Sequence, residues 1–587
     1  MKKKLNILCP KCKEVLKINE KITCDKCSKT YSNKKNIFRL NNYKKEQTDY
    51  SKENKLFLDQ IKKVGYKNAI KIFLEKFPQY KTQLINPEYN QSADHVFYCL
   101  NEKNRKCLVL ENKFGNTVET LSHIYEEVIS QNSRIDDLEI QSERFEKIEN
   151  ITLINSEVEK LNFPDNYFDT ILIENIEKII KNKDIFLIFK EILRILTPEG
   201  CFIFNNSKSH DQIKQILEKS NFITKQYWSM QKNQYPSFSG RIDDNIALRW
   251  YMKNVSNYLI SKKISLQKKI MLRIMKSELN LATSILMKKF VPTIIFCCYK
   301  NNFSTSLLNL IQKETNYKNF VIQSRPKRIK IIILNRKGIP KKIINFNRFG
   351  YKFPLKIKVI SRKFSKMNDP KERMWIEDWH EGNSINPEKI EHVNAAIDWL
   401  FKFQKETKQN VINKNEIKIE VNEIKKNIEK DKLLNFSDCL KWVDEYYQYI
   451  EENNFCETAI HGDYWINNII INSKTSKISV IDWDEYKQKG LPFYDFMVFF
   501  IRLMTITKTS SLDTKKLEKF LDVKSDENKM MRNLKKKIDL HFNSNFNFLI
   551  LLRMFIIKRM VSYDSSLSSE KQLKMLKLLS NKQELFL

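Results

Sequence analysis

Four cysteines in the first 27 residues constrain the fold of this chain more tightly than any other feature. Cys9-Pro-Lys-Cys12 and Cys24-Asp-Lys-Cys27 are two Cys-x-x-Cys turns, and each turn presents two thiolates from one short loop. Zn²⁺ is held by four soft ligands in a tetrahedron, so two such turns fill its coordination shell and leave no open position. We therefore expect a structural zinc site in a small module, residues 1–45. Four free thiols are the alternative, and a redox role is disfavoured because no βαβ unit surrounds either pair.

Length and composition bound the rest of the chain. A single hydrophobic core rarely serves more than about 250–300 residues, so a chain of 587 residues predicts two or three domains. The net charge of +34 raises the question of nucleic-acid or anionic-membrane binding. The excess is mostly lysine in scattered blocks such as 2–4 and 535–537, which favours compositional drift, and we do not expect nucleic-acid binding. Only 9 residues are glycine, so a surviving glycine indicates a backbone position that requires it.

Two further expectations concern the setting of the protein. No segment reaches the roughly 18 apolar residues that a membrane-spanning helix needs, and the start of the chain lacks the pattern of a signal peptide. The 11 cysteines show no disulfide-like spacing beyond the first four. A cytoplasmic location is therefore expected.

Short apolar runs alternate with helix-like stretches between residues 97 and 300. The runs are Cys107–Leu110, Val128–Ser130, Ile151–Ile154, Phe168–Ile173, Cys201–Phe204, Phe222–Tyr227 and Thr293–Tyr299. Strands alternating with helices predict a layered α/β domain. Residues 46–96 are predicted to be a helical linker, and an insert with helical stretches, 229–291, separates the last two runs.

Three segments of this domain carry a resemblance to class I S-adenosylmethionine methyltransferases. Leu108–Thr117 is similar to the first strand and its loop, Ser156–Asp169 to the later acidic and Leu-x-Phe signature, and Leu196–Gly200 to the turn before the fifth strand. The resemblance implies a Rossmann-like sheet and a cofactor, S-adenosylmethionine. The cysteine module resembles the small zinc ribbons found ahead of some methyltransferases.

The cofactor positions depart from the family pattern. The residues that the resemblance assigns to S-adenosylmethionine are Glu111, Gly115 and Glu157. The family's loop carries three spaced glycines, and Lys113 and Thr117 stand in the first and third places. Gln131 replaces the acidic residue that ends the second strand. These departures predict weak binding of S-adenosylmethionine, or none.

A second set of chemical residues lies between 461 and 483. His461-Gly462-Asp463-Tyr464-Trp465-Ile466-Asn467-Asn468 is followed by Val480-Ile481-Asp482-Trp483, with a β-hairpin pattern between them. Phosphoryl transfer needs an acceptor for the substrate hydroxyl proton and oxygens that hold Mg²⁺ on the nucleotide phosphates. Asp463 suits the first role as base. Asn468 and Asp482 suit the second, because the hairpin brings them side by side.

These residues resemble the aminoglycoside phosphotransferase and choline kinase family, and the resemblance covers residues 318–587. It implies Mg²⁺ with ATP or GTP. We interpret His461 as a residue that organises the loop rather than as a catalyst, and Asp495 as a structural anchor for the loop. The family's strand-three lysine, which holds the nucleotide phosphates, is replaced by Asn345. Lys342 lies nearby and is the candidate nucleotide-binding residue, and Lys330 is on the preceding strand.

The sequence thus predicts a multidomain protein of α/β and α+β classes: a zinc ribbon, a Rossmann-like methyltransferase domain (97–300) and a protein-kinase-like domain (318–587). The expected activity is an ATP-dependent phosphotransferase that acts on a hydroxyl of a sugar-like or amino-alcohol metabolite, fused to a methyltransferase domain. The alternative is a non-catalytic scaffold or ligand-binding protein built from two decayed enzyme folds.

Overall fold

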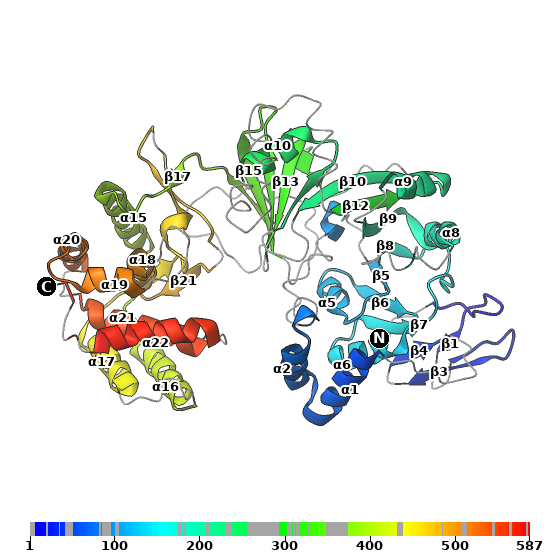
Figure 1. Cartoon of the computed structure of the whole chain (residues 1–587), viewed down its shortest axis with the longest axis horizontal. Coiled ribbons are helices and arrows are strands. Elements are labelled where there is room, and N and C mark those ends of the chain that lie inside the picture. Colours follow the sequence, from blue (N-terminus) through cyan, green and yellow to red (C-terminus); the bar gives the residue numbers. More distant parts are fainter. Residues whose placement is uncertain are drawn as a thin grey trace. The chain divides into compact units, whose positions relative to one another are not determined.

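The computed structural model divides into two compact units, and each is described by itself (Figure 1). Unit 1 comprises Met1–Val359 and Arg373–Trp379, and unit 2 comprises Ile360–Glu372 and His380–Leu587. The structure describes residues 6–18, 22–34, 36–40, 51–80, 84, 95–99, 105–173, 176, 179, 184–206, 210–230, 237–254, 293–301, 308, 311–312, 316–325, 328–347, 374–430, 438–472, 474–483, 485–505, 514–542, 546–562, 566–580, 582 and 585–586.

Five parallel strands form the centre of unit 1. They are β5 (Lys106–Leu110), β6 (Glu127–Asn132), β7 (Ile151–Asn155), β8 (Phe168–Ile173) and β9 (Leu196–Asn206). Their order in the sheet is β7-β6-β5-β8-β9, and every neighbouring pair is parallel. A parallel sheet is covered on both faces, which explains why β5 reads as a continuous apolar run rather than an alternating one. The predicted α/β domain is confirmed at these strands.

Two antiparallel strands extend the sheet beyond β9. The strand β12 (Thr293–Tyr299) pairs with β9, and β10 (Ile223–Met230) pairs with β12. Helices α5 (Asn116–Ser122), α6 (Ile135–Arg144), α8 (Ile185–Ile195) and α9 (His210–Lys219) lie between the strands in the sequence. The segment 197–200, predicted as a turn, is instead part of β9, where the pairing with β8 shifts in register.

The cysteine module is joined to this sheet by backbone pairing. Its strands are β1 (Lys17–Ile18), β2 (Ile22–Thr23), β3 (Thr30–Lys34) and β4 (Ile37–Arg39). The strand β4 pairs in parallel with β7 and so continues the ladder. The amide of Leu8 also donates to the carbonyl of Asn162 at 2.8 Å, and Leu40 donates to Asn155 at 3.0 Å. The module is therefore an extension of the central sheet of unit 1.

The opposite edge of the sheet also continues. The strand β11 (Ser237–Arg241) pairs with β10 and with β13 (Asn319–Ser324), which is followed by β14 (Arg328–Leu334), β15 (Pro340–Asn347) and β16 (Met374–Asp378). The predicted boundary at residue 318 thus falls inside a hydrogen-bonded ladder. No pattern in the sequence predicted β11, which lies in the predicted insert 229–291 together with α10 (Asn245–Asn254). Residues 231–236 and 255–291 of that insert lie outside the described part, as do 348–373.

The predicted linker contains two helices that form part of unit 1. These are α1 (Lys52–Val64) and α2 (Tyr66–Lys76), followed by the short helices η1 (Pro78–Tyr80) and η3 (His95–Tyr98). Phe57 and Phe73 lie with Phe114 in one apolar cluster. The amide of Asn54 donates to Asp136 at 2.8 Å and to Asp137 at 2.7 Å, which ties α1 to the start of α6.

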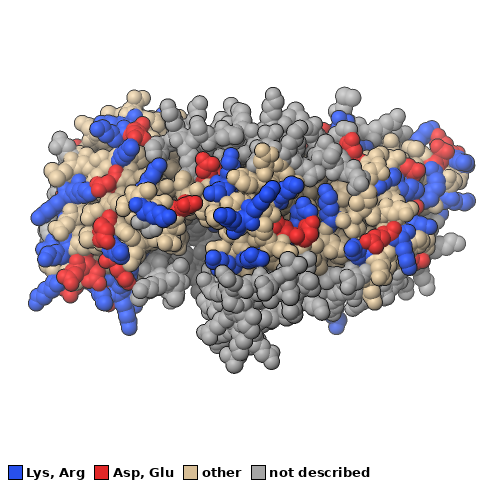
Figure 2. Space-filling view, turned by 90° about the horizontal axis from the view of Figure 1, so that it is seen from above, with Lys and Arg blue, Asp and Glu red and all other residues tan. Residues whose placement is uncertain are grey.

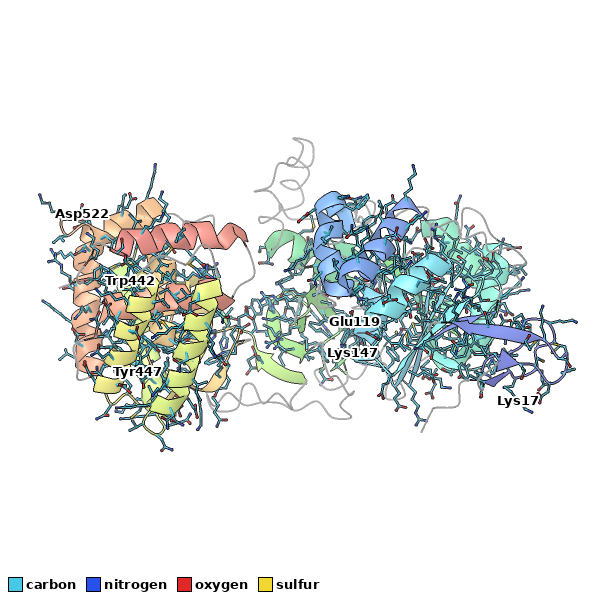
Figure 3. The ribbon with its side chains drawn as sticks, turned by 90° about the horizontal axis from the view of Figure 1, so that it is seen from below. Lys17, Glu119, Lys147, Trp442, Tyr447 and Asp522 are labelled. Carbon is cyan, nitrogen blue, oxygen red and sulfur yellow. The ribbon has the colours of Figure 1, made fainter. Side chains whose placement is uncertain are left out.

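Unit 2 is mainly helical around one hydrophobic core. Its elements are β17 (Asn383–Ser384), α15 (Ile390–Thr407), α16 (Lys414–Lys430), α17 (Asp438–Glu452), β18 (Thr458–Ile460), η5 (Ile466–Asn468), β19 (Ile469–Ile471), β20 (Ile478–Val480), β21 (Lys487–Gly490), α18 (Tyr494–Thr505), α19 (Thr514–Leu521), α20 (Asp526–Phe542), α21 (Phe548–Ser562) and α22 (Ser566–Ser580). Trp442 on α17, labelled in Figure 3, lies under the guanidinium of Arg553, whose Cζ is 4.5 Å from the ring centroid.

The predicted hairpin after residue 468 is confirmed. Strands β19 and β20 pair antiparallel, with Ile469 opposite Val480, and β17 pairs with β19.

The charge on the surface and the length of the helices are relevant to nucleic-acid and membrane binding. On the face drawn in Figure 2, lysine and arginine side chains are spread over the described surface with acidic side chains among them, and they form no single basic stripe. Within the described ranges, no helix combines the length and the apolar character that crossing a membrane requires.

Asp137 gives unit 1 a testable pH dependence. Burial, reinforced by Asp136, raises the pKa of Asp137 from 3.8 to about 7. Between about pH 4 and pH 7 the folded state holds a proton that the unfolded state has lost, so stability falls as the pH rises through this window. Denaturant unfolding of Asp137→Asn across this range should show a flatter pH dependence than wild type. The exposed Asp59→Asn variant should keep the wild-type slope, and equal slopes for Asp137→Asn and wild type would contradict the assignment.

Candidate functional sites

The four predicted cysteine ligands lie together. Their sulfur atoms are all within 4.8 Å of one another, with Cys12 and Cys24 at 3.3 Å and Cys9 and Cys27 at 3.6 Å. Tetrahedral Zn–S bonds of about 2.3 Å place sulfurs about 3.8 Å apart, so the spacing suits a zinc ion. The hydroxyl of Tyr31 lies 3.1 Å from the Cys9 sulfur and forms part of the surrounding shell. Four thiolates leave no open position, which fits a structural site.

A second candidate site lies where the chain direction across the sheet reverses. From β5 the chain runs outward through β6 and β7 and then returns to β8 on the other side of β5. In open α/β sheets, ligands bind at the carboxyl ends of the strands beside this switch point. The loop 111–115 follows β5 at that edge. Glu111 fixes it to the end of β6, since its carboxylate accepts from the amide of Ser133 at 2.9 Å and from the Ser133 hydroxyl at 3.1 Å.

Lys113 and Thr117, which replace two glycines of the family pattern, make packing contacts within unit 1. Lys113 donates to the hydroxyl of Tyr80 at 3.3 Å and lies over that ring, and Thr117 is fully buried. Gly115 has φ +80°, and a Cβ there would collide with Phe145. This glycine is therefore required by close packing against the end of α6.

Arg144 on α6 also supports the loop. It donates to the carbonyl of Phe114 at 3.1 Å and to Glu119, labelled in Figure 3, at 2.6 Å. The loop path is consequently fixed by its surroundings although two family glycines are missing.

Three amide side chains at this edge carry buried acceptor oxygens. They are Oδ1 of Asn112, Oε1 of Gln131 and Oδ1 of Asn132, and none has a hydrogen-bond donor within the described part of the chain. A buried acceptor left without a donor costs about 1–3 kcal/mol, so such atoms call for an explanation. The Nε2 atom of Gln131 donates to the carbonyl of Glu157 at 3.0 Å, which joins two of the predicted cofactor positions. Asn112 and Asn132 were not singled out in the sequence, although they adjoin predicted positions.

The third candidate site is the loop 461–468 in unit 2. Asp495, at the start of α18, accepts from the amides of His461 at 2.7 Å and Gly462 at 2.9 Å, so the predicted anchor is confirmed. Burial raises the pKa of Asp495 to about 7. Gly462 has φ +85°, and a Cβ there would strike the carbonyl of Glu485. Only glycine fits this turn without strain.

His461 organises the same loop. Burial lowers its pKa to about 4, so the ring is neutral near pH 7. Its Nε2 lies 3.0 Å from the carbonyl of Ile481 and acts as donor, while Nδ1 accepts from the amide of Asp463 at 3.3 Å. One ring nitrogen thus ties the loop to Ile481, which precedes Asp482, and the other fixes the backbone within the loop.

The predicted base and metal ligands are brought together. Asn468 donates from Nδ2 to the carbonyl of Asp463 at 2.9 Å and to its Oδ2 at 3.1 Å. The carbonyl of Asn468 accepts from the amide of Ile481 at 2.9 Å, which places Asp482 beside it. Burial raises the pKa of Asp463, and the charge of Asp482 adds to the rise. Since Nδ2 of Asn468 is used by Asp463, its Oδ1 is the atom suited to a cation.

Two arginines near this loop were not found from the sequence. Arg502 on α18 lies over Trp465, with Cζ 5.2 Å from the ring centroid. Its charge and that of Arg559 on α21 both oppose the rise in the pKa of Asp463. The available signal was the spacing of Arg502, which follows Asp495 by two helical turns and so shares its face of α18.

The candidate nucleotide lysine lies on strand β15 of unit 1. Alternate residues of a strand point to opposite faces, so Lys342 shares the face of Ile344, and Asn345 occupies the other. Lys330 pairs directly with Asn345 across the ladder and shares its face. Asn345 is buried. Lys330 therefore lies closer than Lys342 to the position at which the family's lysine stands.

Comparison with known proteins supports the methyltransferase part. A family model described as a methyltransferase domain matches residues 126–278. Residues 126–278 are therefore similar to a methyltransferase domain, and the parallel strands of unit 1 have the Rossmann-like arrangement that such a domain needs. No curated protein matches the chain.

Several solved structures are similar at low identity. YcgJ from Bacillus subtilis is 12% identical, with 36% of this chain and 99% of that chain covered and a TM-score of 0.23. Phosphoethanolamine N-methyltransferase 2 from Haemonchus contortus, with S-adenosyl-L-methionine, is 17% identical, with 36% and 53% covered and a TM-score of 0.24. A chain of the Haloferax volcanii complex between the Trm112 methyltransferase activator and a methyltransferase is 10% identical, with 43% and 98% covered and a TM-score of 0.26. None of these matches names a phosphotransferase.

The zinc site can be tested by metal content and stability. Purified protein should contain one zinc ion per chain by elemental analysis. Because β4 of the cysteine module pairs with β7, Cys24→Ser should lower both zinc content and the melting temperature of unit 1. Cys456→Ser in unit 2 is the matched control and should change neither. Zinc-free wild-type protein with the same melting temperature would contradict a structural site.

Proposed function

We propose that unit 1 binds S-adenosylmethionine and transfers its methyl group to a small-molecule acceptor. The proposal rests on the methyltransferase-domain match and on the buried acceptor oxygens at the switch point. The ribose hydroxyls and the ammonium group of this cofactor are hydrogen-bond donors. Donors of this kind would satisfy Asn112, Gln131 and Asn132, which are otherwise costly to bury.

The residues present fit the cofactor despite the missing glycines. The side chain of Lys113 contacts Tyr80, and the side chain of Thr117 is buried in unit 1. These contacts give neither side chain a reason to block the cofactor. Gln131 in place of a carboxylate keeps an acceptor oxygen but loses the negative charge. A neutral acceptor makes a weaker hydrogen bond than a charged one, so we expect the affinity to be reduced rather than lost.

Calorimetric titration with S-adenosylmethionine tests this proposal. Wild type should bind the cofactor, and Gln131→Leu should weaken binding about tenfold, as expected for losing roughly one hydrogen bond. The exposed Gln215→Leu on α9 should bind as wild type does. Absence of binding to wild type, or unchanged affinity in Gln131→Leu, would contradict the proposal.

A second function is favoured by the geometry of unit 2. We propose that it transfers a phosphoryl group from Mg²⁺–ATP or Mg²⁺–GTP to a hydroxyl of a small metabolite. The observation that supports it is the joint placement of Asp463, Asn468 and Asp482 by one loop and one hairpin. Phosphoryl transfer is mostly a matter of positioning and charge stabilisation, which such a rigid loop can provide.

Each residue has a distinct role in this proposal. Asp463 accepts the hydroxyl proton of the acceptor, and its position is fixed by Asn468 and by the amide contact to His461. Asn468 and Asp482 would hold Mg²⁺, which neutralises charge on the nucleotide phosphates when bound. Asp495 holds the loop by accepting hydrogen bonds from the amides of His461 and Gly462. Lys342, the lysine expected from the sequence to bind the nucleotide, lies in unit 1 on the strand face opposite Asn345.

Two aspartate variants separate binding from turnover. Asp463→Asn should leave Mg²⁺–ATP affinity nearly unchanged and lower the rate about 10²–10⁴-fold, because it removes the base alone. Asp482→Asn should weaken nucleotide affinity as well, because it removes a metal-binding carboxylate. Nucleotide binding is read from thermal unfolding with Mg²⁺–ATP, and turnover from nucleotide hydrolysis or transfer.

The exposed Asp444→Asn variant on α17 is the control and should match wild type in both measurements. If millimolar Mg²⁺–ATP and Mg²⁺–GTP give wild type no thermal protection, the phosphotransferase proposal is wrong and unit 2 is a non-catalytic scaffold.

A further inference from the structure

A groove of about 1920 Å³ lies in unit 1 between the cysteine module and the start of β7. Its lining comes from β1 and the residues before it, from the start of β6, and from the chain that leads from α6 into β7. In Figure 1 the strands β1, β3 and β4 lie beside β7. Pockets for small molecules usually measure about 300–1,000 Å³. The groove is therefore large enough for a segment of polypeptide.

The groove lies at the end of the sheet opposite to the candidate cofactor site. Glu127 begins β6 and Ile151 begins β7, and both residues line the groove. Because β5, β6 and β7 are parallel, the groove is at their amino ends, whereas the loop 111–115 follows the carboxyl end of β5. A ligand in the groove would leave the cofactor site open.

The charge of the groove is opposite to that of the whole chain. It is lined by two lysines, and by six acidic residues: Glu14, Asp25, Glu126, Glu127, Glu146 and Glu149. One of the lysines, Lys17, labelled in Figure 3, lies 2.5 Å from Asp25. The excess of carboxylates makes the groove acidic in a chain whose net charge is +34. Nucleic acid and anionic lipid would be repelled there, and a cationic ligand would be attracted.

Apolar side chains line the same groove. Val15 is 45% exposed, and Ile18, Phe38, Ile148 and Ile151 are half-buried. Exposed apolar surface bordered by charged residues is typical of a surface that binds another protein. A ligand that carries both positive charge and aliphatic side chains would complement the lining.

One strand edge in the groove has no strand opposite it in the described part of the chain. The strand β4 pairs with β7 from Leu153 to Asn155. The carbonyl of Asn155 accepts from the amide of Leu40 and so faces the β4 side, and every second residue of β7 faces the same way. The backbone of Ile151 therefore faces this side beyond the end of β4. An extended segment can add to such an edge by main-chain hydrogen bonds.

We propose that this groove binds an extended segment of a partner protein in which lysines alternate with aliphatic residues. Successive side chains of a strand point to opposite faces, so the lysines meet the carboxylates and the aliphatic residues meet the apolar lining. The backbone of the segment pairs with Ile151. The interaction is separate from both proposed activities, and it attaches the partner at the end of the sheet away from the cofactor site.

Fluorescence anisotropy on the full chain tests the proposal with three short labelled peptides. Lysine alternates with valine in the first peptide, lysine with serine in the second, and glutamate with valine in the third. We expect the lysine–valine peptide to bind and to bind more weakly as salt is added. The lysine–serine peptide should bind more weakly, and the glutamate–valine peptide should not bind. Spermine should not displace the first peptide at matched ionic strength.

Variants then assign the binding to the groove. The double variant Glu146→Gln/Glu149→Gln should weaken binding of the lysine–valine peptide about fivefold, as expected for the loss of two exposed ion pairs. Val15→Ser should weaken binding of the lysine–valine peptide and leave that of the lysine–serine peptide unchanged. The matched control Asp59→Asn/Glu75→Gln, on α1 and α2, removes two exposed charges of the same unit and should bind as wild type does. Unchanged melting temperatures show that the variants fold.

Several results would overturn the inference. These are no binding of the lysine–valine peptide to wild type, equal affinity for the lysine–serine peptide, and undiminished binding in Glu146→Gln/Glu149→Gln. Displacement of the peptide by spermine would instead assign the groove to a small polyamine. Binding that appears only after Lys2→Ser, Lys3→Ser and Lys4→Ser are combined would assign it to the chain's own terminus, which precedes the groove residue Asn6.

Discussion

Backbone hydrogen bonding between strand edges is the interaction on which unit 1 depends. The pairing of β4 with β7 joins the cysteine module to the parallel core, and the pairing of β11 with β13 joins the core to the strands that follow. Left unpaired, the edges of β7 and β11 would expose a row of amides and carbonyls. Here β4 covers the edge of β7 from Leu153 to Asn155, and β13 covers the edge of β11. The four-cysteine cluster and the switch-point edge are thereby carried on one ladder.

Unit 2 is organised around a single buried carboxylate. Asp495 binds two consecutive amides of the loop, and Gly462 supplies the turn that lets both point toward it. His461 then ties the loop to the carbonyl of Ile481. The result is a loop whose backbone path is fixed by contacts within unit 2 itself. Buried amides at the edge of unit 1 differ, because they retain acceptor oxygens that a ligand would satisfy.

The sequence was sufficient to predict those features whose residues lie close together along the chain. The Cys-x-x-Cys pairs, the apolar runs of the parallel strands and the hairpin between Asn468 and Asp482 all depend on short-range pattern. The domain boundary at residue 318 depends on which strand covers the edge of β11, a contact between segments about 80 residues apart that no local pattern encodes. Arg502 was missed for a similar reason, since its contact with Trp465 arises only when α18 lies beside the loop. The face of Lys342 was set by strand register, which composition cannot reveal.

The shared ladder decides where this chain can be cut. A fragment that began at residue 318 would remove β13 from its partner and leave the edges of both β11 and β13 bare. Long unpaired edges recruit other strands, so both halves of such a division would be prone to aggregate. The strands from β13 to β16 thus belong to the same compact unit as the cysteine module, and insolubility of a 318–587 fragment would say nothing about the loop 461–468 that it contains.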